Sequence, residues 1–208
     1  MKRLPDTLPG RVIITDDPLR AKMLAAHHLE FSSVVFELGD VLAYTGSYNG
    51  TELAVVSSGF GSSGVLSCCE ELAGLGVTEI VYLGACSSAD TRHGLRLVIL
   101  AAGGCQNLLE RANAAVMRFD LNAVVRTVQA PGALTPGALT PGAPTSEEGC
   151  IIDDVTGALY EMAGNSGFGA LSILTVSESV AGGEKLEEHE IRSRFYAASR
   201  LAFEVFAI

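Results

Sequence analysis

Apolar and polar positions along the chain predict strands and helices in turn, most clearly between residues 53 and 84. An apolar stretch over 53–57 predicts a strand, and a glycine-rich turn follows over 58–64. Residues 65–75 carry apolar side chains at spacings of three and four, which predicts a helix. A second apolar strand is expected over 79–84. A strand, helix and strand of this length form the parallel βαβ unit with a right-handed crossover.

The same patterns predict elements before this unit. We expect a strand over 11–15 and a helix from Pro18 to about residue 29, because proline suits the first helical position. Three short strands are expected over 33–57, and Asn49-Gly50 is a typical hairpin turn between the last two. In the helix, the side chains expected to face the core are Leu19, Met23, Leu24 and Ala26.

After the central unit, a continuous apolar run over 95–102 predicts another strand, and residues 106–128 are expected to hold one or two helices. A helix through Leu159 and a strand over 169–176 follow. Residues 184–208 show apolar side chains on one helical face, which predicts one long amphipathic helix. This alternation predicts an α/β protein, and 208 residues suit a single domain, 1–208.

Composition narrows the class of protein. Hydrophobic residues make up 48% of the chain, and the mean hydropathy is +0.33, which is enough for a large core. The apolar runs are broken well before 18 residues, so we expect no transmembrane helix. The first ten residues, MKRLPDTLPG, lack the apolar stretch of a signal peptide. A cytoplasmic protein that does not bind membranes is therefore expected.

Charge and cysteine content exclude further classes. A net charge of −10 and a pI near 4.8 argue against nucleic acid as a partner. The five cysteines show no spacing typical of zinc, so we expect no metal site and interpret them as buried thiols in a reducing compartment.

Two sequence features need separate interpretation. Residues 131–145 read PGALT, PGALT, PGAPT, a composition that cannot propagate a helix or a strand ladder and predicts a mobile surface loop. Gly59-x-Gly61-x-x-Gly64 has the spacing of a dinucleotide-binding fingerprint. That fingerprint requires an acid at the end of the second strand, whereas Glu79 opens the strand here, so a dinucleotide site is disfavoured.

An ordered set of motifs resembles the purine nucleoside and uridine phosphorylase family. The motifs are TDDPLRA (15–21), TGSYNG (45–50), SSGFGSSG (57–64), EELAGLGV (70–77), YLGACSSA (82–89) and TVSES (175–179). The family's usual forms are GDPxR, TGxYxG, GxG, xGSxG or xGTxG, and TxSD. The resemblance covers about residues 11–105 and 150–206. It implies a three-layer α/β/α fold with a central mixed sheet.

The resemblance also implies a reaction: phosphate attacks the ribose of a nucleoside while an acid protonates the leaving base, without a further cofactor. Arg20 matches the family's phosphate-binding arginine. Asp16 replaces the glycine of that motif, Tyr82 stands where a second arginine is usual, and Ala85 replaces a serine or threonine. Gly39 lies where one branch supplies an arginine from a neighbouring subunit. Three expected anion donors are therefore missing.

The nucleoside side of the site is also carried over from the resemblance. Glu178 matches the catalytic aspartate after the last strand, and Phe60 matches a residue that packs against the sugar. Asp153 and Asp154 lie in the segment whose counterpart holds the ribose hydroxyls, although two carboxylates there are equally suited to capping a helix. The floor is expected to comprise Gly59–Gly61 and Gly84–Ser87, with Gly59, Gly61, Gly84 and Ala85 in contact with the substrate.

Several functions remain open from the sequence. The first is a phosphorylase that cleaves a purine nucleoside with phosphate, since an acid at position 178 favours a purine leaving group. The second is a hydrolytic nucleosidase in which Asp16 serves as the base for water. The third is a homologue that binds nucleosides without turnover. The resemblance further implies a homo-oligomer, a dimer or a hexamer.

Overall fold

The computed structural model describes residues 4–5, 7–90, 92–131, 150–180, 182–193 and 195–207. The predicted loop of PGALT repeats falls almost wholly outside these described residues.

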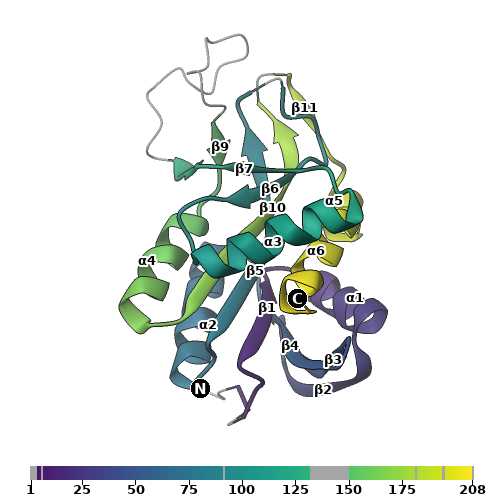
Figure 1. The fold of residues 1–208 in the computed structure, drawn as a ribbon, viewed down its shortest axis with the longest axis vertical. Helices are drawn as coiled ribbons and strands as arrows, with labels where there is room; N and C mark the ends of the chain where they lie inside the picture. Colours follow the sequence, from purple (N-terminus) through teal and green to yellow (C-terminus); the bar gives the residue numbers. More distant parts are fainter. Residues whose placement is uncertain are drawn as a thin grey trace.

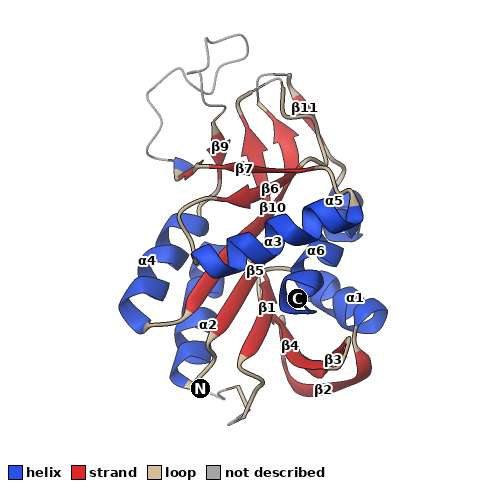
Figure 2. Cartoon of the chain, viewed as in Figure 1, coloured by secondary structure: helices blue, strands red, loops and turns tan. Residues whose placement is uncertain are grey.

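One twisted mixed sheet runs through the molecule (Figures 1 and 2). Its main path follows the order β2-β3-β4-β1-β5-β10-β6-β7. The strands on this path are β1 (Arg11–Thr15), β2 (Glu30–Leu38), β3 (Val41–Tyr48), β4 (Thr51–Ser58), β5 (Glu79–Ser88), β6 (Val98–Ala101), β7 (Ala123–Arg126) and β10 (Gly169–Ser179). The short strands β8 (Val128–Gln129), β9 (Ile151–Ile152) and β11 (Glu184–Lys185) pair at its margins.

Helices cover both faces of this sheet. Helices α2 (Ser62–Gly74) and α4 (Thr156–Ser166) contribute buried side chains to one apolar cluster. Helices α1 (Pro18–His28), α3 (Gln106–Phe119) and α6 (Tyr196–Ala207) contribute to a second cluster, and the short helix α5 (Glu188–Ser193) packs beside α1. Alternate residues of the central strands serve the two clusters, as Ile80 and Val81 of β5 do. The expected three-layer fold with a mixed sheet is therefore confirmed. All described elements pack on one sheet, in keeping with the single domain that we propose.

The central βαβ unit is present with longer elements than predicted. Strand β5 continues to Ser88, and α2 begins three residues early, at Ser62. The predicted hairpin turn is confirmed at Asn49-Gly50, where both residues adopt positive φ, as a primed turn requires.

Two predicted helices differ from the structure. The helix within 106–128 ends at Phe119, because Asp120 adopts a left-handed conformation, and the following residues form β7 and β8. The predicted long C-terminal helix is divided into β11, α5 and α6. Arg20 donates a hydrogen bond to the Ile191 carbonyl oxygen, which a continuous helix would pair with the amide of Phe195.

The inward face of α1 also differs from the prediction. The buried residues are Arg20, Ala21, Leu24 and Ala25, whereas Ala26 is exposed and Leu19 is 44% exposed. The helix is rotated toward Arg20, which lies under Phe195 of the C-terminal segment. None of the helices in the described ranges is both long and apolar enough to cross a membrane.

Candidate functional site at the carboxyl edge of the sheet

Four neighbouring parallel strands end at one edge of the sheet. The register pairs Thr15 of β1 with Ser57 of β4, and Ser87 of β5 with Glu178 of β10. In open α/β sheets, ligands bind beyond the carboxyl ends of parallel strands. The pairing therefore brings three predicted parts of the site to one edge: the segment after β1, the turn after β4 and the acid at the end of β10.

Arg20 is at this edge, but its donors are directed at the protein. Its side chain is 6% exposed. Nη1 donates to Thr15 Oγ1 at 2.8 Å and to Asp16 Oδ1 at 3.0 Å, and Nη2 donates to the Ile191 carbonyl at 2.9 Å. The guanidinium also stacks on Phe195, at 4.6 Å from the ring centre, and Nε is buried without a hydrogen-bond partner among the described residues. A phosphate group would have to replace contacts that Arg20 already makes.

Asp16 supplies the anion that Arg20 binds. Its side chain is about one third exposed, so this ion pair lies at the rim of the site rather than in the core. Two opposite charges at about 4 Å attract by roughly 4 kcal/mol at an effective dielectric constant of 20. The replacement of the family's glycine by Asp16 therefore has a direct structural effect, because the Asp16 carboxylate accepts a hydrogen bond from Nη1 of Arg20.

The side chain of Tyr82 packs against the backbone of Gly84, in the predicted floor of the site. A Cβ placed on Gly84 would lie 2.5 Å from the Tyr82 hydroxyl oxygen and ring, so this position accepts only glycine while Tyr82 keeps its place. Burial, and then the charges of Asp153 and Asp16, raise the pKa of Tyr82 well above its usual value, and Arg20 opposes this shift. The neutral phenol therefore offers no positive charge where the family's second arginine is expected.

Asp153 is buried and caps a helix. Its Oδ2 accepts from the amides of Val155 and Thr156, at 3.2 and 2.7 Å, and from the Thr156 hydroxyl at 2.6 Å. Burial raises the pKa of Asp153, and these hydrogen bonds partly offset the shift. Of the two interpretations of the acidic pair, helix capping describes Asp153, whereas Asp154 is exposed.

Glu178 is an accessible acid at the end of β10. Its side chain is 43% exposed, Oε2 accepts from the Ser87 hydroxyl at 3.3 Å, and Lys185 Nζ lies 3.9 Å away. A shift in the pairing register between Val176 and Glu178, as at a β-bulge, changes the direction of the strand at this point. Glu178 thus lies beside β5.

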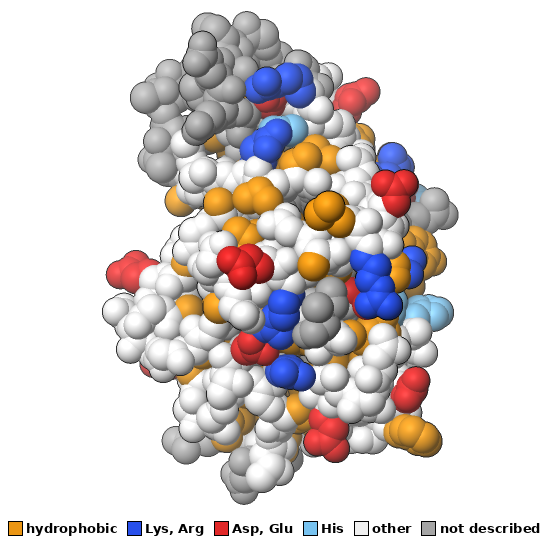
Figure 3. Space-filling view, viewed as in Figure 1, with side chains coloured by type: hydrophobic (Ala, Val, Ile, Leu, Met, Phe, Trp, Pro, Cys, Tyr) orange, Lys and Arg blue, Asp and Glu red, His pale blue; other side chains and the backbone are white. Residues whose placement is uncertain are grey.

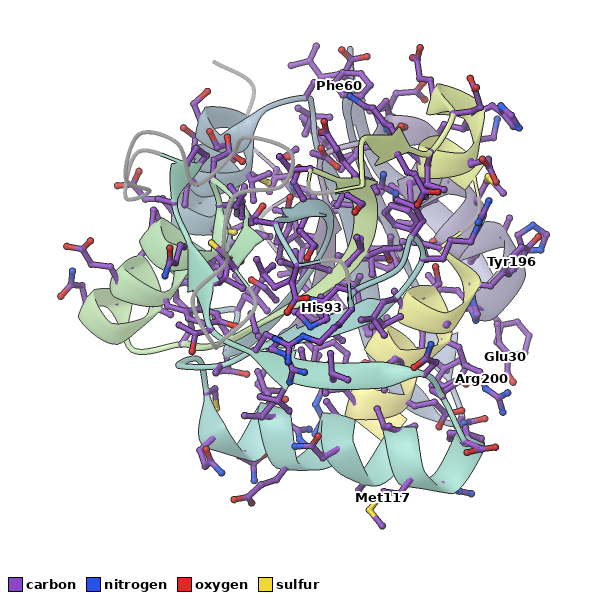
Figure 4. All side chains as sticks on the ribbon, turned by 90° about the horizontal axis from the view of Figure 1, so that it is seen from above. Glu30, Phe60, His93, Met117, Tyr196 and Arg200 are labelled. Carbon is purple, nitrogen blue, oxygen red and sulfur yellow. The ribbon has the colours of Figure 1, made fainter. Side chains whose placement is uncertain are left out.

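The remaining predicted residues line the edge in different ways. Gly59 and Gly61 adopt φ values of +78° and +94°, which favour glycine, and they form the turn into α2. Phe60 between them is 58% exposed and lies at the periphery of the molecule in Figure 4. Ala85 is half-buried and packs against the cluster of α1, α3 and α6.

Three contacts of this edge were not predicted. Ser87 holds Glu178, and Ile191 and Phe195 hold Arg20. Ser87 was expected in the floor of the site, but its hydrogen bond to Glu178 was not. Ile191 and Phe195 lie more than 170 residues from Arg20, and no local pattern indicates this contact. Among the described residues, no cluster of three or more His, Cys, Asp and Glu side chains could hold a metal.

Comparison with known proteins gives near-full-length matches. The chain is 30% identical to a DeoD-type purine nucleoside phosphorylase of Hahella chejuensis, over 96% of this chain and 94% of that protein. It is likewise 30% identical to a DeoD-type 2 enzyme of Vibrio parahaemolyticus, over the same shares. The chain belongs to the purine nucleoside phosphorylase family. A DeoD-type relative from Aliivibrio salmonicida is 27% identical over 93% of the chain, whereas no family model matches.

Asp16, Tyr82 and Ala85 are therefore substitutions within this family. The fold is consistent with that of the nucleoside phosphorylase family. The charges that act on Tyr82 are one arginine and three carboxylates, those of Asp153, Asp16 and Asp154. Carboxylates therefore outnumber positively charged side chains among the groups that act on Tyr82.

Proposed function

We propose that this protein cleaves the N-glycosidic bond of a purine nucleoside, with phosphate as the attacking group. The observation that carries the proposal is Glu178, a half-exposed acid at the end of β10 beside Ser87, in a chain that matches phosphorylases over nearly its whole length. The leaving purine takes a proton from Glu178, and the ribose, which becomes positively charged, lies toward the carboxylates near Tyr82. Nucleoside and phosphate are the only ligands that this reaction needs.

A second candidate is supported by Arg20. Because its donors are occupied by Thr15, Asp16 and Ile191, the site is poorly prepared for phosphate. Water would then be the nucleophile, with Asp16 as its base, or the protein would bind the nucleoside without cleaving it. Both candidate functions use the same nucleoside site and Glu178. They differ in the nucleophile, which is phosphate in the first and water in the second.

The test is to incubate the purified protein with inosine, adenosine and uridine, with and without phosphate, and to follow the free base by chromatography. Release from the purine nucleosides that requires phosphate and yields ribose 1-phosphate supports the first candidate. Release without phosphate, with free ribose as product, supports the hydrolytic one. If no base is released but a purine nucleoside raises the melting temperature, binding without turnover is the better account.

The role of Glu178 is tested in the same assay. Loss of a general acid typically lowers the rate by about 10²–10⁴-fold, so Glu178→Gln should nearly abolish base release. Glu184→Gln is a matched control, because Glu184 is an exposed acid of β11 that pairs with Ser179 in the same ladder. Equal rates in the Glu178→Gln variant and the wild type would contradict the assignment.

A further inference from the structure

A cavity of about 300 Å³ lies between the loop after β5 and strand β7, and none of its lining residues belongs to the predicted nucleoside site. Its lining is apolar at Leu95, Leu97 and Val124 and polar at Asn122. Arg92, His93, Gly94 and Arg126 complete the wall. Figure 4 shows His93 beside β7, and basic and histidine side chains gather near the top of the face in Figure 3. Such a cluster contrasts with the net charge of −10.

His93 holds Arg126 in a fixed orientation. Arg126 Nε donates to His93 Nε2 at 3.2 Å, so that ring nitrogen must be an acceptor. The ring proton therefore lies on Nδ1, 3.1 Å from the hydroxyl of the buried Ser88. His93 itself is 3% exposed, and this chain of contacts ties the cavity wall to the end of β5.

The guanidinium of Arg126 retains donors for a ligand. Its Nη1 donates to the Val125 carbonyl at 2.7 Å, whereas Nη2 makes no hydrogen bond to a described residue. In the described part of the chain, no carboxylate forms an ion pair with Arg126. The nearby Asp90 is bound by Arg92 through three hydrogen bonds from side-chain nitrogens, between 2.5 and 3.0 Å, and therefore already has its partner.

We propose that this cavity is a second ligand site, which binds a small phosphate group through Arg126, with Arg92 and Asn122 around it. A planar guanidinium matches a phosphate group with two parallel hydrogen bonds. The apolar floor lowers the local dielectric constant, which strengthens such a charged contact. The volume suits inorganic phosphate or a small phosphate monoester, at the lower end of ordinary ligand sites.

The site is tested by titrating the ¹⁵N-labelled protein with inorganic phosphate and, separately, with ribose 5-phosphate, and by following backbone amide shifts. Saturable shifts at Gly94, Asn122 and Arg126 are expected. Stronger binding of one probe identifies the source of the phosphate group. Shifts confined to Gly84–Ser88 and the segment after β1 would overturn this proposal and leave the nucleoside site unaffected.

Two variants of equal charge change complete the test. Arg126→Gln should weaken binding at the cavity by about tenfold or more, as loss of a charge-assisted hydrogen bond does. Arg118→Gln removes the same charge from an exposed position on α3 and should leave binding unchanged. Equal affinity of the Arg126→Gln variant and the wild type, or equal loss in both variants, would overturn the proposal.

Discussion

At the scale of single residues, Asp16 and Arg20 form an ion pair at the place where we propose that phosphate binds. The carboxylate lies 3.0 Å from Nη1 of the arginine and repels a second anion. The arginine was predictable from its motif. The contacts of the arginine were not predictable. Its Nη2 donates to a carbonyl oxygen 171 residues away, and residue spacing carries no information on such a contact.

We expect Asp16→Gly, which restores the family's residue, to strengthen phosphate binding by about tenfold, because one repulsive charge is removed and Nη1 is released. Asp16→Asn should act in the same direction with a smaller effect, since the amide oxygen still accepts from Arg20. The measurement is calorimetric titration with phosphate at the wild-type pH and ionic strength.

Asp120→Asn is the control for this pair, because it removes an exposed carboxylate at the end of α3, and asparagine tolerates the positive φ of that residue. A phosphate affinity of Asp16→Gly within twofold of the wild type would show that Asp16 is not what limits anion binding.

At the scale of elements, the beginning of α4 distinguishes a structural role of Asp153 from a role in ribose binding. Oδ2 accepts three hydrogen bonds there. Asp153→Ala should lower the free energy of unfolding by about 1–2 kcal/mol, as loss of a helix cap does. Asp153→Asn keeps an acceptor oxygen and should cost less.

The pH dependence sharpens this prediction. Burial raises the pKa of Asp153, so the folded state holds this proton more tightly than the unfolded state. The corresponding contribution to stability is present below the unfolded pKa, near 4, and is lost as pH rises through the folded pKa. In the Asp153→Asn variant, which cannot titrate at this position, the free energy of unfolding should not show this decrease with rising pH. Denaturant unfolding at pH 4 and pH 7 measures it, and Asp154→Asn is the exposed control.

The elements themselves were predictable to different degrees. Strands such as β1 and the Asn49-Gly50 hairpin follow from local patterns, because apolar runs and turn residues act over a few positions. The division of the C-terminal segment into α5 and α6 does not, since its apolar period continues through the break. The competing interaction comes from Arg20 on α1, a tertiary contact that overrides local propensity.

At the scale of the whole molecule, two histidines should make stability depend on pH. Burial is the main cause that lowers the pKa of His28 and of His93. The charged neighbours are His27, Arg200 and Glu204 for His28, and Asp90, Arg126 and Arg92 for His93. A lowered pKa favours the neutral ring in the folded state. The contribution of each histidine to stability is therefore present above pH 6.5 and is lost as pH falls through the folded pKa of that histidine.

We therefore expect the melting temperature to decrease between pH 7 and pH 5. The double variant His28→Phe and His93→Gln should decrease less, and the phenyl ring should keep the stack on Phe203, whose centroid lies 4.5 Å from that of His28. Parallel curves for the wild type and the double variant would assign the loss to other groups. Arg92 holds the pKa of Asp90 at about 2, so the contribution of this carboxylate to stability is intact between pH 7 and pH 5 and is lost only below about pH 4.

Strand β2 has the surface expected of a contact between copies of the chain. It forms one end of the main strand path, and Figure 1 shows it at the margin of the molecule. It carries neither lysine nor proline, which commonly protect an edge strand, and its only charged residues are Glu30 and Glu37. Its exposed apolar residues are Phe31 (93%), Val34 (54%), Val35 (39%) and Leu38 (49%). Phe31 also adopts a positive φ of 55°, which is unusual for a bulky residue.

A free edge with these side chains favours association, so we expect the protein to form a homo-oligomer, a dimer or a hexamer, through β2. Phe31→Lys combined with Val34→Lys places two charges in that contact and should at least halve the mass measured by size-exclusion chromatography with light scattering. Met117→Lys is the matched control, because Met117 is 85% exposed on α3, away from β2. A monomeric wild type would contradict the oligomer. An unchanged mass of the double variant would move the contact to another surface, since two buried lysines without partners would not be tolerated there.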